Sequence, residues 1–239
     1  MIEIAPGVYA LGGKKGGHVR AFLLDHGELT LVDTLFEDDA RGVLAALRAL
    51  GRSPHDLERI VLTHAHRSHL GGVAALKRAS GAKVLAHEFE ADIVAGERRA
   101  QPVTLRPMQS LRLLPFQLGL ALGRPKHVAC PVDDAIANDD AVGPLQVLHA
   151  PGHSPGHLAF FWPERGVLLA GDAIATWPDL CPGWKPFTLN HEQHADSLRR
   201  MAALDARVVG VGHGDAITQD AADVVRRLLP GPRLATSPC

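Results

Sequence analysis

Cysteine, tyrosine and long apolar runs are scarce in this chain of 239 residues, and each scarcity argues against a class of protein. The three cysteines, Cys130, Cys181 and Cys239, are scattered and odd in number, which favours reduced thiols in a cytoplasmic setting over a disulfide framework. The longest apolar stretches, near 113–122 and 157–162, are interrupted and too short to span a bilayer. We therefore expect no membrane-spanning segment.

The sequence also shows no signal-peptide pattern and has little net charge. The N-terminal sequence MIEIAPGVYAL has neither the basic start nor the apolar core of a signal peptide, so we expect no export. The formal net charge is -1, which gives no basic field that would attract nucleic acid non-specifically. These absences favour a cytoplasmic protein without a nucleic-acid or membrane partner.

Short apolar runs alternate with segments of helical spacing along most of the chain. Strands are expected at 19–25, 28–33, 59–63, 83–86, 145–149, 157–162, 167–170 and 207–211, and helices at 38–50, 70–79, 88–95, 191–204 and 220–229. Such alternation implies sheets with helices on their outer faces. We expect one domain over residues 1–229 and a flexible tail over 230–239.

Residues 97–142 break this rhythm, with several prolines around the apolar stretch LRLLPFQLGLALG. Two interpretations stay open for this segment. It either forms a hairpin or helix pair that completes the core, or it forms a lid or wall over a pocket, because apolar segments beside a site often serve as binding surfaces.

Histidine is unusually frequent, with 14 copies against one tyrosine, and several copies follow apolar strands on glycine-containing turns. Loops at strand ends are where α/β folds place their working residues. In an extended segment residues two apart point to the same side, so His64 and His66 can hold one ion together, while His69 would face a neighbouring point. Because structural zinc sites more often use cysteine, a set of histidine and aspartate favours an open, catalytic metal site.

Four motifs follow one another in the order THAHRSHLGG (63–72), GHSPGH (152–157), GD (171–172) and GHGD (212–215). In this pattern the chain resembles the metallo-β-lactamase-fold superfamily of hydrolases, whose hallmark is a T-H-x-H-x-D-H-x-G-G loop followed by G-H-[ST]-P-G-H, G-D and a late G-H. The resemblance extends from PGVYAL near the N-terminus to His213. It implies an α/β fold of the four-layer αββα sandwich type, with a metal centre at one edge.

The resemblance also implies roles for individual residues. The first metal would be bound by His64, His66 and His153, Asp172 would bridge to the second, and His69 and His213 would complete that second site. His157 would have a structural role beside them. The implied cofactor is zinc, as one or two ions, with iron or manganese as alternatives. Asp33, in LVDT, is expected to fix the turn below the metal loop by hydrogen bonds, and Gly71 and Gly72 to permit close packing.

Ser68 stands where the family pattern has its loop aspartate. Ser68 and Asp172 are therefore the candidate catalytic residues, because both decide how the second ion and its water are held. A serine hydroxyl is a far poorer ligand than a carboxylate. Three consequences stay open: the second metal binds more weakly, the enzyme works with one metal, or the chain is an altered variant or non-catalytic relative. One ion can suffice, since it can acidify a water molecule on its own.

The implied function is metal-dependent hydrolysis of a small-molecule substrate. The apolar segment 111–122 with Trp177 and Trp184 favours a partly apolar ester, lactone, thioester or amide, and weak β-lactamase or lactonase activity fits the same site. Two alternatives stay open: a mononuclear iron oxidoreductase that resembles persulfide dioxygenases, and a non-catalytic binding protein. The length is short for the extra helical domain of glyoxalase II-type thioesterases, and a homodimer stays open.

Overall fold

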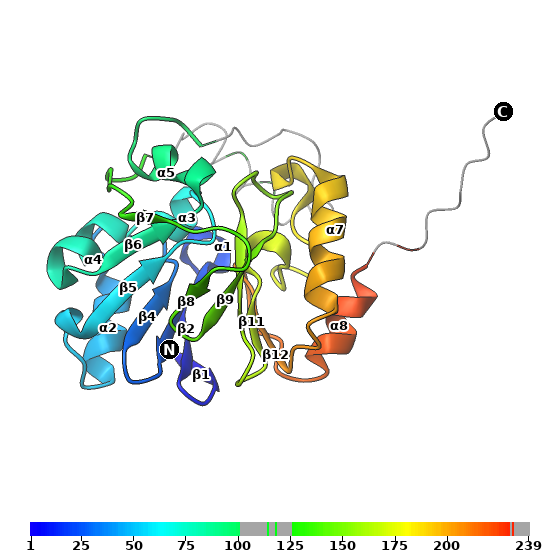
Figure 1. Ribbon diagram of the computed structural model, residues 1–239, viewed down its shortest axis with the longest axis horizontal. Coiled ribbons are helices and arrows are strands. Elements are labelled where there is room, and N and C mark those ends of the chain that lie inside the picture. The colour runs from blue at the N-terminus through cyan, green and yellow to red at the C-terminus, as the bar shows by residue number, and fades with distance from the viewer. Residues whose placement is uncertain (101–113, 115–117, 119–125, 230, 232–239) are drawn as a thin grey trace.

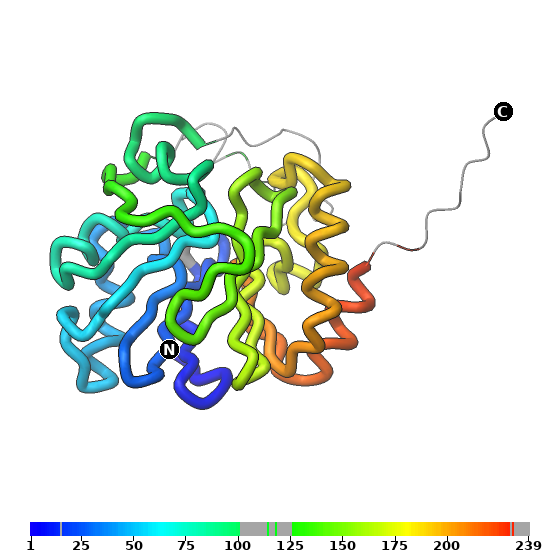
Figure 2. The backbone as a smooth tube through the Cα atoms, in the orientation of Figure 1, coloured from blue at the N-terminus to red at the C-terminus, as the bar shows by residue number. Residues whose placement is uncertain are grey.

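Two β-sheets stacked face to face form the centre of this computed structural model, and helices cover the outer face of each sheet (Figure 1). The structure describes residues 1–100, 114, 118, 126–229 and 231. Figure 2 follows the chain from the blue-to-cyan part, which builds most of one sheet, to the green-to-red part, which adds the last strand of that sheet and builds the other sheet with its covering helices. The αββα sandwich expected from the sequence is confirmed.

Within the described residues, one sheet has seven strands and the other has five. The larger sheet has the order β1 (Ile2–Ala5), β2 (Val8–Gly12), β3 (Arg20–Asp25), β4 (Leu29–Val32), β5 (Leu57–Val61), β6 (Lys83–Ala86) and β7 (Asp134–Ala135). Its first four strands are antiparallel and its last four parallel. The smaller sheet has the order β12 (Val208–Gly210), β11 (Val167–Leu169), β10 (Leu158–Trp162), β9 (Leu145–His149) and β8 (Ala141–Val142).

The helices fall into two outer layers and several short connecting turns. The larger sheet is covered by α2 (Arg41–Ala49) and α4 (Val73–Ser80), and the smaller one by α7 (His191–Ala202) and α8 (Ala221–Arg227) (Figure 1). The shorter elements are α1 (Lys15–His18), α3 (Arg67–Leu70), α5 (Glu88–Val94) and the 3-10 turns η1 (Pro54–Asp56), η3 (Gly171–Ala173) and η4 (Lys185–Phe187). Within the described residues no helix is both long enough and apolar enough to cross a bilayer.

Central strands are apolar on both faces because each face of each sheet is covered. In β10, Leu158 and Phe160 point toward the other sheet, whereas Ala159 and Phe161 pack in the outer helical layer with Leu198 of α7. This arrangement follows from the two-residue repeat of a strand. It explains why the sequence LAFFW reads as a continuous apolar run.

Several expected element boundaries near the candidate site differ from the structure by one to three residues, and two of these differences have a clear local cause. Strand β4 ends at Val32 because Asp33 has a φ of 62°, in the left-handed region, which turns the chain out of the sheet. The helix expected at 70–79 corresponds to α4 and begins at Val73, because Gly71 and Gly72 separate it from the short helix α3, which ends at Leu70. A Cβ at Gly71 would collide with the backbone carbonyl of Phe36, so this close approach requires glycine, as expected.

The segment 97–142 falls partly outside the described residues. Its described part places β7 at one edge of the larger sheet and β8 at one edge of the smaller sheet, and Ile136 and Val142 join the core between the sheets. Both interpretations of the segment 97–142 stay predictions, because residues 101–113, 115–117 and 119–125 lie outside the described residues. The expected tail, 230–239, also lies outside the described residues except for Gly231.

Candidate metal centre

Loops that follow β5, β9, β11 and β12 meet and bring all six expected ligand residues together. The six are His64, His66, His69, His153, Asp172 and His213. Five of them are buried, and His66 is partly buried. Because each loop follows a strand of a rigid sheet, the backbone that carries these side chains is fixed by the surrounding sandwich.

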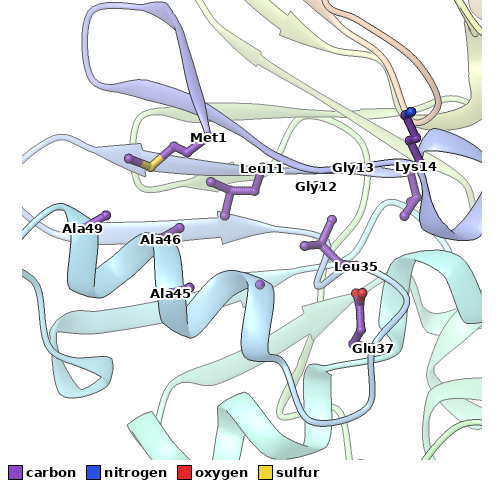
Figure 3. Close-up of a pocket in the computed structure, with 12 residues that line it drawn as sticks. Met1, Leu11, Gly12, Gly13, Lys14, Leu35, Glu37, Ala45, Ala46 and Ala49 are labelled. Carbon is purple, nitrogen blue, oxygen red and sulfur yellow. The ribbon is translucent and has the colours of Figure 1, made fainter.

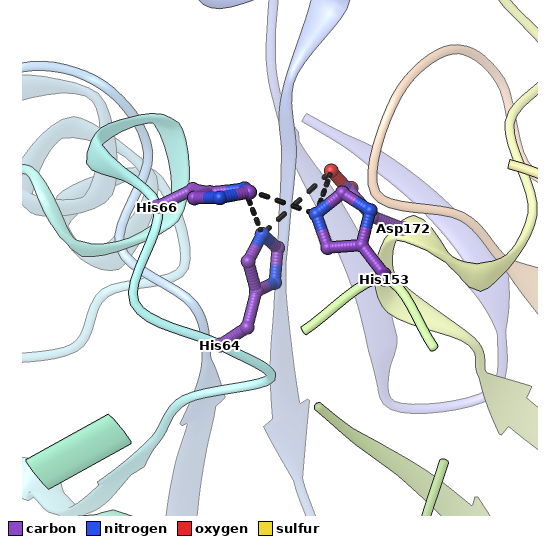
Figure 4. A group of neighbouring side chains, drawn as sticks. All are labelled: His64, His66, His153 and Asp172. Atoms are coloured by element: carbon purple, nitrogen blue, oxygen red, sulfur yellow. Dashed lines mark hydrogen bonds and ion pairs between the residues drawn. The ribbon is translucent and has the colours of Figure 1, made fainter. Parts of the chain in front are cut away.

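The ligand-type atoms form two groups that share Asp172. The first group is His64, His66, His153 and Asp172, the second is His69, Asp172 and His213, and within each group the atoms lie within 4.8 Å of one another. In the first group, Nδ1 of His66 lies 3.1 Å from Nε2 of His64 and 2.9 Å from Nε2 of His153 (Figure 4). In the second, Nε2 of His69 lies 3.3 Å from Nε2 of His213. Each group could hold one cation.

A buried acceptor at Nδ1 turns Nε2 of His64 toward the first group. The hydroxyl of Thr63 donates to Oδ2 of Asp33 at 2.8 Å, so its oxygen accepts from Nδ1 of His64, which lies 3.0 Å away. The proton of this imidazole is therefore on Nδ1. The Nε2 lone pair points into the first group, as ligation requires.

The second group is oriented in the same way. Nδ1 of His69 donates to Oδ2 of Asp33 at 2.9 Å, and Nδ1 of His213 donates to the carbonyl oxygen of Gly17 at 2.7 Å. Both Nε2 atoms therefore face the group. Asp33 performs the orienting role expected from LVDT, through contacts to both Thr63 and His69.

Burial keeps the three imidazoles of the first group neutral. It lowers the pKa of His64 and His153 well below the ordinary value and lowers the pKa of His66 to about 4. At neutral pH these three imidazoles are uncharged and each presents a lone pair. Neutral imidazole is the form that binds zinc, iron and related ions.

The second group contains two side chains, His69 and Asp172, whose charged forms stabilise each other. Burial alone would lower the pKa of His69, but the carboxylates of Asp172 and Asp33 raise it to about 10. Burial alone would raise the pKa of Asp172, but the imidazoles of His213 and His69 hold it well below its usual range. A buried carboxylate among imidazole nitrogens is a donor set that fits a divalent cation, which would neutralise its charge.

Ser68 and His157 lie outside both groups of ligand atoms. Ser68 lies in α3 beside His69 and is partly buried, so among the described residues the second group has three ligand residues against four in the first. His157 is buried, and its Nε2 accepts a hydrogen bond from the backbone N–H of Asp172 at 3.2 Å. Its place agrees with the structural role expected from the resemblance.

An aromatic cluster lies against the second group. The ring of Trp184 packs on His213 with 4.3 Å between centroids, and Phe187 packs on Trp184 at 5.5 Å. Trp177 is partly buried and stacks on His18 at 4.8 Å. These aromatic residues lie beside the candidate ligand residues, and whether they form a substrate pocket stays a prediction. The segment 111–122 lies outside the described residues except for residues 114 and 118.

Several residues that orient the site give no local signal in the sequence. Arg20 donates from Nε to the carbonyl oxygen of Gly214 at 2.6 Å and from Nη2 to Asp215 at 2.7 Å, which fixes the turn that carries His213. These partners are about two hundred positions apart in the chain, so no motif could reveal the pairing. Glu90 has a comparable role, described below.

A groove of about 460 Å³ lies between β2 and α2, on the outer side of the larger sheet (Figure 3). It is lined mostly by small and apolar residues, together with Lys14 and Glu37. None of the six ligand residues lines it. We therefore place the chemistry at the histidine and aspartate cluster and assign no catalytic role to this groove.

The protein-family model of the metallo-beta-lactamase superfamily matches residues 15–213. The chain belongs to this superfamily. The metallo-beta-lactamase family protein TTHA1429 from Thermus thermophilus is 30% identical, with a TM-score of 0.67 over 95% of this chain and 79% of that one. The protein TTHA1623, solved in a di-iron-bound form, is 27% identical, with a TM-score of 0.63 over 93% of this chain and 98% of that one.

A curated relative with a stated activity is the hydroxyacylglutathione hydrolase of Cereibacter sphaeroides (strain ATCC 17025 / ATH 2.4.3). It is 32% identical over 180 residues, which cover 75% of this chain and 54% of that hydrolase. The chain thus spans about half the length of this relative. Membership of a metallo-beta-lactamase superfamily of metallo-hydrolases, together with the histidine and aspartate cluster, supports a hydrolase in general.

Proposed function

We propose that this protein is a metal-dependent hydrolase of a small, partly apolar ester, lactone, thioester or amide. Its metal ligands are proposed to be His64, His66, His153, Asp172, His69 and His213. One observation supports the proposal: two groups of ligand-type atoms share a buried carboxylate, and buried acceptors at Nδ1 turn the Nε2 atoms of His64, His69 and His213 toward that carboxylate.

A divalent cation bound in the first group would supply Lewis acidity, which lowers the pKa of a water molecule enough for attack at neutral pH. The neutral imidazoles of His64, His66 and His153 hold the position of that cation. Asp172 spans both groups and balances their charge. Ser68 supplies no charge, so the second group is proposed to bind its ion more weakly than the first. Zinc is the proposed cofactor, with iron or manganese as alternatives.

The proposed substrate class is supported by the aromatic cluster beside His213 and by one relative. Trp184 is buried against His213, and Trp177, which packs on Trp184 and is only partly buried, would offer apolar surface for an uncharged acyl or leaving group. The Cereibacter relative is named for hydrolysis of a hydroxyacylglutathione, and such a compound is a thioester. A thioester is therefore the first substrate to test.

The proposal is tested by loading the purified protein separately with Zn²⁺, Mn²⁺ and Fe²⁺. Bound metal, hydrolysis of a chromogenic ester and of an acylglutathione thioester, and oxygen uptake with a persulfide are then measured. We expect bound metal and hydrolysis in the wild type. The His64→Ala variant should lose activity about 100-fold or more, because it lacks a ligand. His55→Ala, at an exposed histidine of η1, is the matched control and should keep full activity.

Two results would overturn the proposal. A folded wild-type protein that binds none of the three ions would show that the cluster is not a metal site. Bound iron with oxygen consumption and no hydrolysis would identify an oxidoreductase instead.

A further inference from the structure

Glu90 is a buried carboxylate that joins the two loops of the first ligand group. It lies on α5, is 2% exposed, and belongs to neither group of ligand atoms. Within the described residues it has no ion-pair partner. A buried carboxylate is costly unless hydrogen bonds compensate it, so the donors around Glu90 indicate what the residue does.

Three donors from two distant loops supply that compensation. Oε2 accepts from the backbone N–H of Ala65 at 3.0 Å, and Ala65 lies between His64 and His66. Oε1 accepts from the hydroxyl of Ser154 at 2.7 Å and from the backbone N–H of Gly156 at 3.1 Å. Ser154 directly follows His153. One side chain thus bonds to both loops that carry the histidines of the first group.

The fit around Glu90 leaves little freedom. A Cβ at Gly156 would lie 2.8 Å from Cγ and Oε1 of Glu90, so the glycine of GHSPGH lets the loop approach this carboxylate closely. A glutamine at position 90 could not replace it. Its amide NH₂ would face the N–H of either Ala65 or Gly156, because one of these donors lies on each side of the carboxylate.

We infer that Glu90 is a positioning residue for the first metal site, which sets the distance between the His64–His66 loop and the His153 loop. It acts through the backbone and Ser154, and touches no ligand imidazole. This inference rests on the proposed function, since it concerns the ion held by those three histidines. Partners of this kind outside the ligand set typically change metal affinity about 10-fold to 100-fold when they are lost.

The test compares Glu90→Gln with Glu88→Gln, an exposed carboxylate on the same helix. Stepwise metal affinities are measured by chelator competition, the visible spectrum of the Co²⁺-loaded protein is recorded at saturation, and unfolding of the metal-free protein is followed by circular dichroism. We expect Glu90→Gln to bind the first ion about 10-fold to 100-fold more weakly and to shift the Co²⁺ bands. The affinity of Glu90→Gln for the second ion should equal that of wild type, and Glu88→Gln should equal wild type in both affinities and in its Co²⁺ spectrum.

A purely structural role would lower the unfolding midpoint and leave the Co²⁺ spectrum and first-ion affinity unchanged, which would overturn the inference. If Glu90→Gln does not fold, Ser154→Ala decides, because it removes one donor and keeps both backbone bonds. The affinity of Ser154→Ala for the first ion should be roughly threefold lower than that of wild type, and an unchanged affinity would overturn the inference. A wild type that binds no metal defeats the proposed function itself, whereas tight binding in both wild type and Glu90→Gln defeats this inference alone.

Discussion

Nδ1 of His69 lies 2.9 Å from Oδ2 of Asp33, and both side chains are buried. The same carboxylate accepts from the backbone N–H and the hydroxyl of Thr63, each at 2.8 Å, and Thr63 in turn orients His64. One aspartate therefore orients a histidine of each ligand group. It does so directly for the second group and through a hydroxyl for the first.

The Asp33→Asn variant should weaken metal binding, most of all in the second group. An amide has only one acceptor oxygen, so its NH₂ would face either Nδ1 of His69 or the backbone N–H of Thr63. In the first case the ring would place its proton on Nε2 and lose the lone pair that faces the group, and in the second the amide would repel the backbone before His64. We expect about 10-fold to 100-fold weaker affinity for the second ion, measured by competition with a chelator. Asp38→Asn, at an exposed carboxylate nearby, should bind as wild type does. Equal affinities in the two variants would contradict the orienting role.

A carboxylate at position 68 should strengthen the second site. The second group has three ligand residues among those described, and Ser68 lies in α3 beside one of them. We expect Ser68→Asp to bind the second ion about 10-fold more tightly, because a charged ligand replaces a neutral hydroxyl. Ser68→Asn has a similar shape without the charge and should not gain affinity. If wild type, Ser68→Asp and Ser68→Asn all bind the second ion with the same affinity, the residue at position 68 does not determine the affinity of the second site.

Gly71→Ala should destabilise the fold at the junction of α3 and α4. The added Cβ would collide with the backbone of Phe36, which cannot move aside as a flexible side chain can. We expect a loss of about 1–3 kcal/mol in the free energy of unfolding, measured with urea. Gly13→Ala is the control, since its Cβ would have no neighbour within 4 Å. A stability loss of the same size in both variants would show that contact with Phe36 is not the cause.

Removing metal with a chelator should lower the thermal midpoint, and adding Zn²⁺ back should restore it. An ion that binds only the folded state stabilises it by about 4 kcal/mol at a thousandfold excess over its Kd. His153→Ala, which lacks one ligand of the first group, should show a much smaller shift on Zn²⁺ addition. A thermal midpoint that changes neither with chelator nor with added Zn²⁺ would show that the folded protein has no tight metal site.

Features carried by local spacing could be predicted from the sequence. The spacing of His64 and His66 indicated their common direction, and buried strands such as β10 were readable because both of their faces are apolar. Family motifs added the four-layer fold. The element boundaries were less predictable, because the left-handed turn at Asp33 and the break at Gly71 depend on contacts between loops.

Asp33 was expected to orient the site, but two other residues that hold the candidate ligand residues in place could not be predicted in this way. Glu90 bonds to backbone groups of Ala65 and Gly156, and any residue type carries those groups. Arg20 bonds to a carbonyl oxygen far along the chain. Such contacts arise only when distant loops meet, so they have no pattern in the sequence.

The most direct test of the metal centre is a crystal of the Zn²⁺-loaded protein, with anomalous diffraction recorded on both sides of the zinc absorption edge. The account predicts a strong peak among His64, His66, His153 and Asp172, and a weaker peak among His69, Asp172 and His213. No peak in a fully loaded, folded protein, or a peak bound by other residues, would contradict it.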